Sequence, residues 1–176
     1  MIILISGASH TGKTYLAQKV LEKTLIPSIS QDHLKMGLIR SGHINVTVFD
    51  DKKLTEVLWP ITREMIKTAI ENHQNMIIEG CYIPCDWKKD FDAQMLSEIR
   101  YVALIMSEKY IHMHEKEIIE YGDVIEMRQD KTINKEELIN DNKIMLENCG
   151  KFKLPYVFID KSYDTMNETL CLLGII

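Results

Sequence analysis

The segment from Gly7 to Thr14 constrains this chain more than any other feature. It reads Gly-Ala-Ser-His-Thr-Gly-Lys-Thr, fits the pattern G-x-x-x-x-G-K-[ST], and follows directly on the apolar run 1–6. That run, bounded by Ser6, predicts a buried parallel strand. Apolar residues spaced as on one helix face then continue until Pro27 ends the helix: Leu16, Ala17, Val20, Leu21 and Leu25. A strand, a glycine loop and a helix N-terminus together predict a binding site for phosphate groups.

This loop indicates how a nucleoside triphosphate would be held. Backbone N–H groups and the positive end of the helix dipole favour the phosphates. We expect Lys13 to reach the β and γ phosphates and the Thr14 hydroxyl to ligate Mg²⁺. His10 occupies a variable position of the pattern. The alternative is a chance glycine-rich turn, but the strand and helix favour ATP and Mg²⁺ as cofactors. The residues expected to bind ATP are Gly7, Ser9, His10, Thr11, Gly12, Lys13 and Thr14.

Composition narrows the class of protein. A chain of 176 residues is most simply one domain. Its net charge of -5 opposes a general role at nucleic acids or membrane surfaces, which favour basic proteins. The four cysteines form no Cys-x-x-Cys pair, so we expect reduced thiols and a cytoplasmic protein. No targeting signal is expected, and the apolar end 170–176 is too short to span a bilayer.

Strand and helix patterns alternate along the rest of the chain. Further strands are expected at 27–30, 75–80, 100–106 and 155–160, and helices from 31 to about 41, at 53–73, at 108–121 and from 134 to 149. Pro60 is expected to kink the second of these helices or to begin its second half. The pattern predicts an α/β fold, a five-stranded parallel sheet with helices on both faces. Ligands bind outside the carboxyl ends of such strands, which places Asp32, Glu79, Ser107 and Asp160 near the site.

Two further stretches, together with the loop, resemble nucleoside-monophosphate kinases. Asp32-His-Leu-Lys35 is similar to the start of the acceptor-binding helix of adenylate kinases, and Glu79-Gly80 stands where they carry Asp-Gly-Phe-Pro-Arg. This chain has Lys35 where they have arginine, and Cys-Tyr-Ile-Pro follows Gly80. The resemblance implies a three-layer P-loop NTPase fold, with 1–176 as a single kinase domain. It would carry an acceptor-binding insertion at about 32–73 and a small helical lid at about 108–134.

Another branch of the same superfamily is more similar. The stretch from Asp32 to Arg40 and the helix with Trp59-Pro60 and Arg63 resemble small bacterial proteins described as 2-phosphoglycerate kinase-like or zeta-toxin-like. That resemblance implies that Asp32 takes the proton from an acceptor hydroxyl. Phosphoryl transfer also needs an oriented hydroxyl and a nearby carboxylate on physical grounds. The alternative for Asp32 is an N-cap of the helix it begins, and it can do both.

The remaining candidate residues are charged. Glu79 is expected to hold a Mg²⁺-bound water or the acceptor, and its alternative is a solvated carboxylate at a strand end. Arg128, in the expected lid, is the candidate for contacting ATP and stabilising the transferring phosphoryl group, against the alternative of a surface arginine. The expected acceptor-binding residues are Lys35, Arg40, Arg63 and Glu79.

Three functions are therefore open. The first is an ATP:Mg²⁺-dependent phosphotransferase that acts on the hydroxyl of a small-molecule acceptor. The second is a nucleoside monophosphate kinase with an altered acceptor site, which needs no base. The third is a nucleotide-binding regulatory module with little turnover, which the scarcity of arginine in the expected lid favours. The acceptor's identity, the choice between ATP and GTP, and the oligomeric state do not follow from these patterns.

Overall fold

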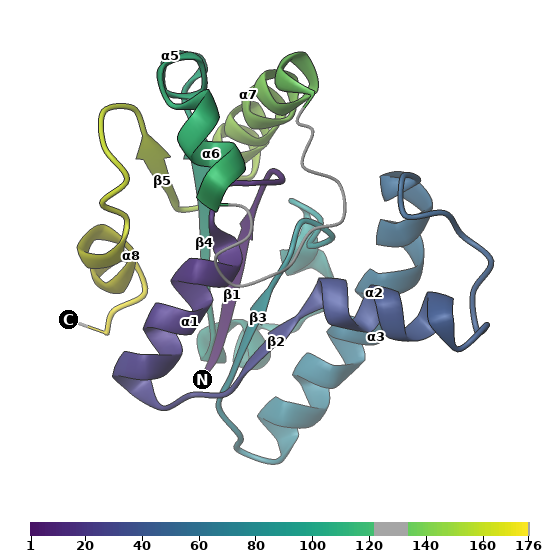
Figure 1. Cartoon of the computed structure of the whole chain (residues 1–176). Helices are drawn as coiled ribbons and strands as arrows, with labels where there is room; N and C mark the ends of the chain where they lie inside the picture. Colours follow the sequence, from purple (N-terminus) through teal and green to yellow (C-terminus); the bar gives the residue numbers. More distant parts are fainter. Residues whose placement is uncertain (122–133, 176) are drawn as a thin grey trace.

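The expected parallel sheet is present in the computed structural model, which describes residues 1–121 and 134–175. All five strands are parallel, in the spatial order β2-β3-β1-β4-β5. Figure 1 shows β1 at the centre of the sheet. The strands are β1 (Ile2–Gly7), β2 (Ser28–Ser30), β3 (Met76–Glu79), β4 (Ile99–Met106) and β5 (Tyr156–Ile159). The α/β fold class predicted from the alternating patterns is thereby confirmed.

Helices connect these strands. They are α1 (Lys13–Thr24), α2 (Gln31–Arg40), α3 (Asp51–Glu71), the 3₁₀ helix η1 (Trp87–Asp90), α4 (Ala93–Glu98), α5 (Glu108–Met113), α6 (Glu115–Tyr121), α7 (Lys135–Phe152) and α8 (Met166–Leu172). None of the helices within the described ranges is long and apolar enough to cross a bilayer.

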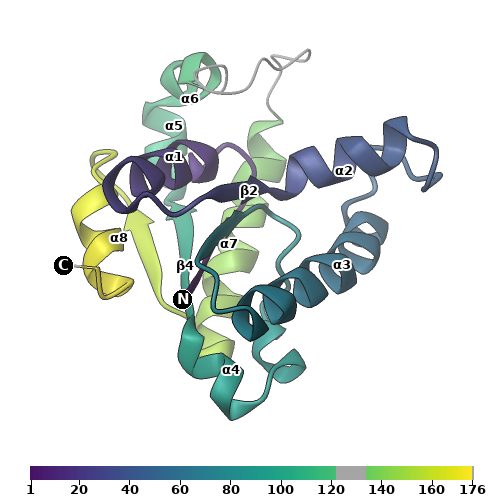
Figure 2. The ribbon, with the colours of Figure 1, turned by 90° about the horizontal axis from the view of Figure 1, so that it is seen from below.

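Two cores lie on opposite faces of the sheet, because successive side chains of a strand point to opposite sides. On one face Ile3 and Ile5 belong to a buried cluster with residues of α1, α5 and α8. On the other face Ile2 and Leu4 join a cluster with residues of α3, η1 and the C-terminal half of α7. Figure 2 shows α1 and α3 on opposite sides of the strands. The result is a three-layer arrangement in which β1 is completely buried.

A third, smaller core joins the segment 32–73 to the residues that follow β3. Leu54 and Leu58 of α3 pack with Tyr82, which follows β3, and side chains of α2 lie against them. In Figure 1 α2 and the start of α3 project to one side of the sheet. Tyr82 therefore joins this projecting pair of helices to the end of β3.

Several element boundaries differ from the prediction. Helix α3 runs through Pro60 without a second start, and the buried side chains of Trp59 and Ile66 hold it against the sheet. The helix expected at 108–121 consists of two helices, α5 and α6, that meet at His114. Helix α7 continues past Gly150 because its left-handed cap is at Lys153. The elements η1 and α4 were not expected.

Leu25 offers a test of backbone strain outside the site. It ends α1 in the left-handed conformation (φ 61) and is 85% exposed, so its side chain contributes little packing. A left-handed residue with a Cβ costs about 1–2 kcal/mol, whereas glycine costs less there but more in the unfolded chain. We expect Leu25→Gly to raise the free energy of unfolding by about 0.5–1 kcal/mol, or Tm by about 1–3 °C. Leu25→Ala keeps the Cβ and is the control. A Tm for Leu25→Gly at or below that of Leu25→Ala would contradict this explanation.

Candidate functional site

The loop between β1 and α1 has the backbone geometry of an anion cradle. Gly7, His10 and Gly12 all have positive φ angles, 145°, 61° and 80°. A Cβ on Gly7 would lie 2.5 Å from the backbone oxygen of Leu104, which cannot move out of the sheet. Gly7 is therefore required both by its φ angle and by its close approach to β4.

The N-terminus of α1 opens onto this loop. In the described part of the chain no side chain caps α1, and its first turn holds no acidic residue. The first N–H groups of a helix have no partner within the helix, and they carry the positive end of its dipole. Gly12 at the N-cap leaves them open to an anion.

Lys13 is folded back over the loop. Its Nζ donates a hydrogen bond of 2.7 Å to the backbone oxygen of Ala8, and the residue is only 8% exposed. The Thr11 hydroxyl donates to the same oxygen at 2.9 Å. The ammonium thus lies within the loop itself.

Thr14 and Glu79 meet across the mouth of the loop. The Thr14 hydroxyl donates to Glu79 Oε1 at 3.2 Å, and Glu79 is 2% exposed at the end of β3. A hydroxyl and a carboxylate are the oxygen ligands that Mg²⁺ accepts beside water and phosphate oxygens. Within 1–121 and 134–175 no cluster of three or more His, Cys, Asp or Glu side chains could hold a metal. Mg²⁺ bound with a nucleotide requires only one or two protein ligands, so this pair fits it.

Asp32 lies in the first turn of α2, and its side chain does not cap the helix. The N-cap of α2 is Ser30, whose hydroxyl accepts a hydrogen bond of 3.2 Å from the Asp32 N–H. The alternative that Asp32 itself caps the helix is therefore wrong. Its carboxylate forms an ion pair with Lys35, and the Asp32 side chain is 32% exposed.

Sequence reasoning missed Gln31. This residue is 1% exposed, donates to the Thr62 hydroxyl at 3.2 Å, and accepts from the Tyr82 N–H at 3.1 Å. A Cβ on Gly80 would lie 2.3 Å from its Oε1, so Gly80 makes room for it. Gln31 thus ties α2, α3 and the segment after β3 together. A polar residue directly after a strand was the only sequence signal, and it resembled an ordinary helix start.

Tyr82 and Asp51 were also missed, and both lie beside Lys35. Lys35 Nζ donates to the Tyr82 hydroxyl at 3.1 Å, and that hydroxyl is 3.4 Å from Asp51 Oδ1. Burial raises the pKa of Tyr82 far above its usual value, so the phenol stays protonated and can donate to Asp51. Partial burial of the Asp51 carboxyl raises its pKa, while the Lys35 ammonium opposes that shift.

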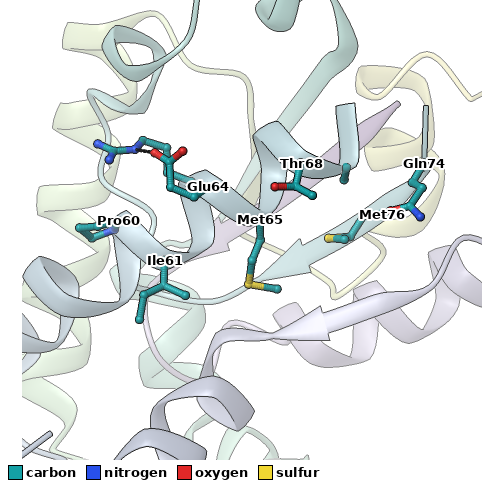
Figure 3. A pocket seen from close by; sticks show the side chains of 9 residues that line it. Pro60, Ile61, Glu64, Met65, Thr68, Gln74 and Met76 are labelled. Carbon is teal, nitrogen blue, oxygen red and sulfur yellow. Dashed lines mark hydrogen bonds and ion pairs between the residues drawn. The ribbon is translucent and has the colours of Figure 1, made fainter. Parts of the chain in front are cut away.

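Two of the three predicted arginines, Arg40 and Arg63, belong to the described residues. Arg63 forms ion pairs with Glu64 at 2.7 Å and with Asp90 at 3.7 Å. It lines a groove of about 670 Å³ whose other residues include Pro60 and Met65 of α3 (Figure 3). These contacts do not bring Arg63 together with Asp32. Arg40 is exposed at the end of α2. Arg128 and part of the expected lid fall outside the described residues.

Tyr163, from the segment after β5, supports the loop from the other side. Its hydroxyl donates to the backbone oxygen of Thr11 at 3.0 Å. Burial raises the pKa of Tyr163 to about 12, so this donor persists at neutral pH. A Cβ on Gly12 would lie 1.8 Å from the same hydroxyl. The loop is therefore enclosed between β4 and Tyr163, with glycine at both contacts.

Comparison with known proteins defines the fold class. Neither family models nor curated proteins match the sequence. A shikimate kinase from Bacteroides thetaiotaomicron superposes with a TM-score of 0.56 at 16% identity, covering 99% of this chain and 95% of that one. A gluconokinase from Sinorhizobium meliloti gives a TM-score of 0.52 at 15% identity, with 98% and 89% covered. A sugar kinase from Janibacter gives 0.52 at 13%, with 99% and 94% covered. The chain has the fold of the P-loop small-molecule kinases.

Gly12 allows a test of the loop geometry. We expect Gly12→Ala to weaken ATP binding at least tenfold, because the Cβ displaces Tyr163 or the loop. Gly42 has a similar φ of 74° but open space around it, so Gly42→Ala carries the same backbone strain without the clash. Calorimetric titration with ATP and Mg²⁺ measures both variants. Equal ATP affinity in Gly12→Ala and Gly42→Ala would contradict the assigned loop.

Proposed function

We propose that this protein is an ATP:Mg²⁺-dependent phosphotransferase that transfers the γ-phosphate to a hydroxyl of a small molecule. One observation carries the proposal. Glu79 contacts Thr14 of the loop and is paired in register with Ser30, which caps the helix bearing Asp32. The loop follows β1 and Asp32 comes shortly after β2, the two strands on either side of β3, so the loop and this carboxylate lie at the same edge of the sheet.

Each residue has a role in the proposed reaction. Lys13 and the N–H groups of the loop bind the phosphates, while Thr14 and Glu79 hold Mg²⁺ and its waters. Mg²⁺ would neutralise charge on the phosphate oxygens. Asp32 accepts the proton of the acceptor hydroxyl as its oxygen bonds to the γ-phosphorus, and the bond from that phosphorus to ADP breaks. Arg128 would contact ATP from the lid.

The acceptor would bind between α2 and α3. The three structural neighbours are named for gluconate, shikimate and sugar, which are all polyhydroxyl compounds. We therefore propose a polyhydroxyl acceptor. Arg40 and Arg63 stay as candidates for binding parts of the acceptor farther from Asp32. We further propose that 1–176 act as one domain, in the cytoplasm.

Two alternative functions predict different behaviour. A nucleoside monophosphate kinase would require cations free to bind the acceptor phosphate, yet Lys35 is paired with Asp32 and Tyr82. A regulatory module would bind ATP and form no phosphorylated product.

The central test of this function is phosphoryl transfer from ATP to a panel of polyols, amino sugars, nucleosides and nucleoside monophosphates. Asp32→Asn is expected to lower kcat by roughly 10²–10⁴, the usual contribution of a general base. Lys13→Ala is expected to abolish transfer. Asp86→Asn, which removes another aspartate from an i,i+3 pair with lysine, serves as the control and is expected to keep full activity. Full activity in Asp32→Asn would contradict the proposed base, and ATP binding without any product would favour the regulatory module.

The metal ligands can be tested separately. Thr14→Val and Glu79→Gln are each expected to raise the Mg²⁺ concentration for half-maximal activity by roughly 10–100-fold, the range for losing a ligand or its partner. Thr24→Val is the matched control, because the Thr24 hydroxyl donates to the backbone oxygen of Val20 and accepts from the Ile26 N–H, away from the loop. An unchanged Mg²⁺ requirement in both site variants, with folding preserved by circular dichroism, would remove this pair from the metal site.

A further inference from the structure

Lys35 is held from several sides. Its ammonium pairs with Asp32, donates to the Tyr82 hydroxyl, and lies 5.3 Å from the centre of the Tyr82 ring. Only 14% of the Lys35 side chain is exposed, whereas lysine is normally solvated. A lysine in this position is not a freely mobile surface charge.

Tyr82 is the residue that fixes this lysine. It is 3% exposed, its ring packs with Leu54 and Leu58, and its N–H is bonded to Gln31. Backbone and ring are thus both immobilised, so the hydroxyl has a defined place. That hydroxyl accepts from Lys35 on one side and can donate to Asp51 on the other.

We propose that Tyr82 is a positioning residue of the phosphoryl-transfer reaction, acting through the chain Asp51–Tyr82–Lys35–Asp32. The inference rests on the proposed function, in which Asp32 is the base. Asp51 at the start of α3 orients the Tyr82 hydroxyl, the hydroxyl orients the Lys35 ammonium, and the ammonium holds one oxygen of the Asp32 carboxylate. A carboxylate held in one rotamer needs less reorganisation to meet the acceptor hydroxyl.

These four side chains also join three separate elements. Asp51 belongs to α3, Lys35 and Asp32 belong to α2, and Tyr82 follows β3. Movement of α3 relative to β3 would therefore change the environment of Asp32. Because the charge of Lys35 is paired with that of Asp32, we assign Lys35 to positioning Asp32. The sequence had predicted instead that Lys35 binds an acceptor anion.

Tyr82→Phe tests the proposal, because phenylalanine keeps the ring that packs with α3 and removes only the hydroxyl. We expect kcat to fall roughly ten- to a hundredfold, as for the loss of one hydrogen bond to a charged group, with KM for ATP unchanged. The rate is measured with the best acceptor of the panel and also with water, the smallest hydroxyl acceptor. Tyr156→Phe, at an exposed tyrosine of β5, is the matched control.

A second readout reports on Lys35 itself. Acylation of lysines by an N-hydroxysuccinimide ester, followed by mass spectrometry, should label Lys35 slowly in the wild type and several-fold faster in Tyr82→Phe, with exposed Lys52 as reference. Lys35→Met should lower kcat. Adding Tyr82→Phe to it should lower kcat little further, because both residues act on Asp32 through the same series of contacts.

The outcomes separate this inference from the proposed function. Full activity in Asp32→Asn would overturn the base, while Lys35 labelling would still report whether Tyr82 holds the lysine. Faster labelling with a lower kcat in Tyr82→Phe, and non-additive effects with Lys35→Met, would support the inference. Unchanged labelling, or an unchanged kcat despite faster labelling, would overturn it. A loss of thermal stability alone would also overturn it, since that is the result of a purely structural role.

Discussion

The hydrogen bond from Thr14 to Glu79 connects the parts of this molecule that must act together. Thr14 belongs to the first turn of α1, whose N-terminus faces the loop, and Glu79 is a buried carboxylate at the end of β3. An almost fully buried carboxylate is costly unless it is hydrogen-bonded or bound to a metal. The hydrogen bond from the Thr14 hydroxyl offsets part of that cost. The next residues along the chain link Glu79 to two helices. Gly80 and Tyr82 contact Gln31 of α2, and the Tyr82 ring packs against α3.

Beyond Glu79, the start of α2 is held in place by close packing and a few buried polar contacts. Gln31 lies against Gly80 and binds both Thr62 and the backbone of Tyr82, so the start of α2 is fixed relative to β3. Asp32 is the next residue, so the contacts of Gln31 also fix the place of its backbone. The third core beneath Tyr82 supports the same helices with apolar contacts. The loop and the start of α2 are thus linked through the end of β3.

The sequence predicted the parts of this arrangement that depend on local patterns. The loop, the five strands and the place of Asp32 and Glu79 at strand ends followed from apolar periodicity and from one motif with a strict spacing. The Asp51–Tyr82–Lys35 contacts did not, because they join residues up to 47 positions apart and no local pattern marks them. Arg63 looked available for an anion, but its partner Asp90 lies in η1, an element that no periodic pattern announced. Polar contacts between residues far apart in the sequence therefore could not be predicted from it.

A crystal structure with Mg²⁺ and a non-hydrolysable ATP analogue tests the central claim most directly. We predict triphosphate oxygens on the N–H groups of the loop, with the Lys13 ammonium moved from the Ala8 backbone oxygen to the phosphates. Mg²⁺ should lie beside the Thr14 hydroxyl, with Glu79 at the ion or its waters. The Asp32 carboxylate should face the γ-phosphate across an open space. Phosphates bound elsewhere, with Lys13 still on Ala8, would contradict the assignment of this loop as the nucleotide site.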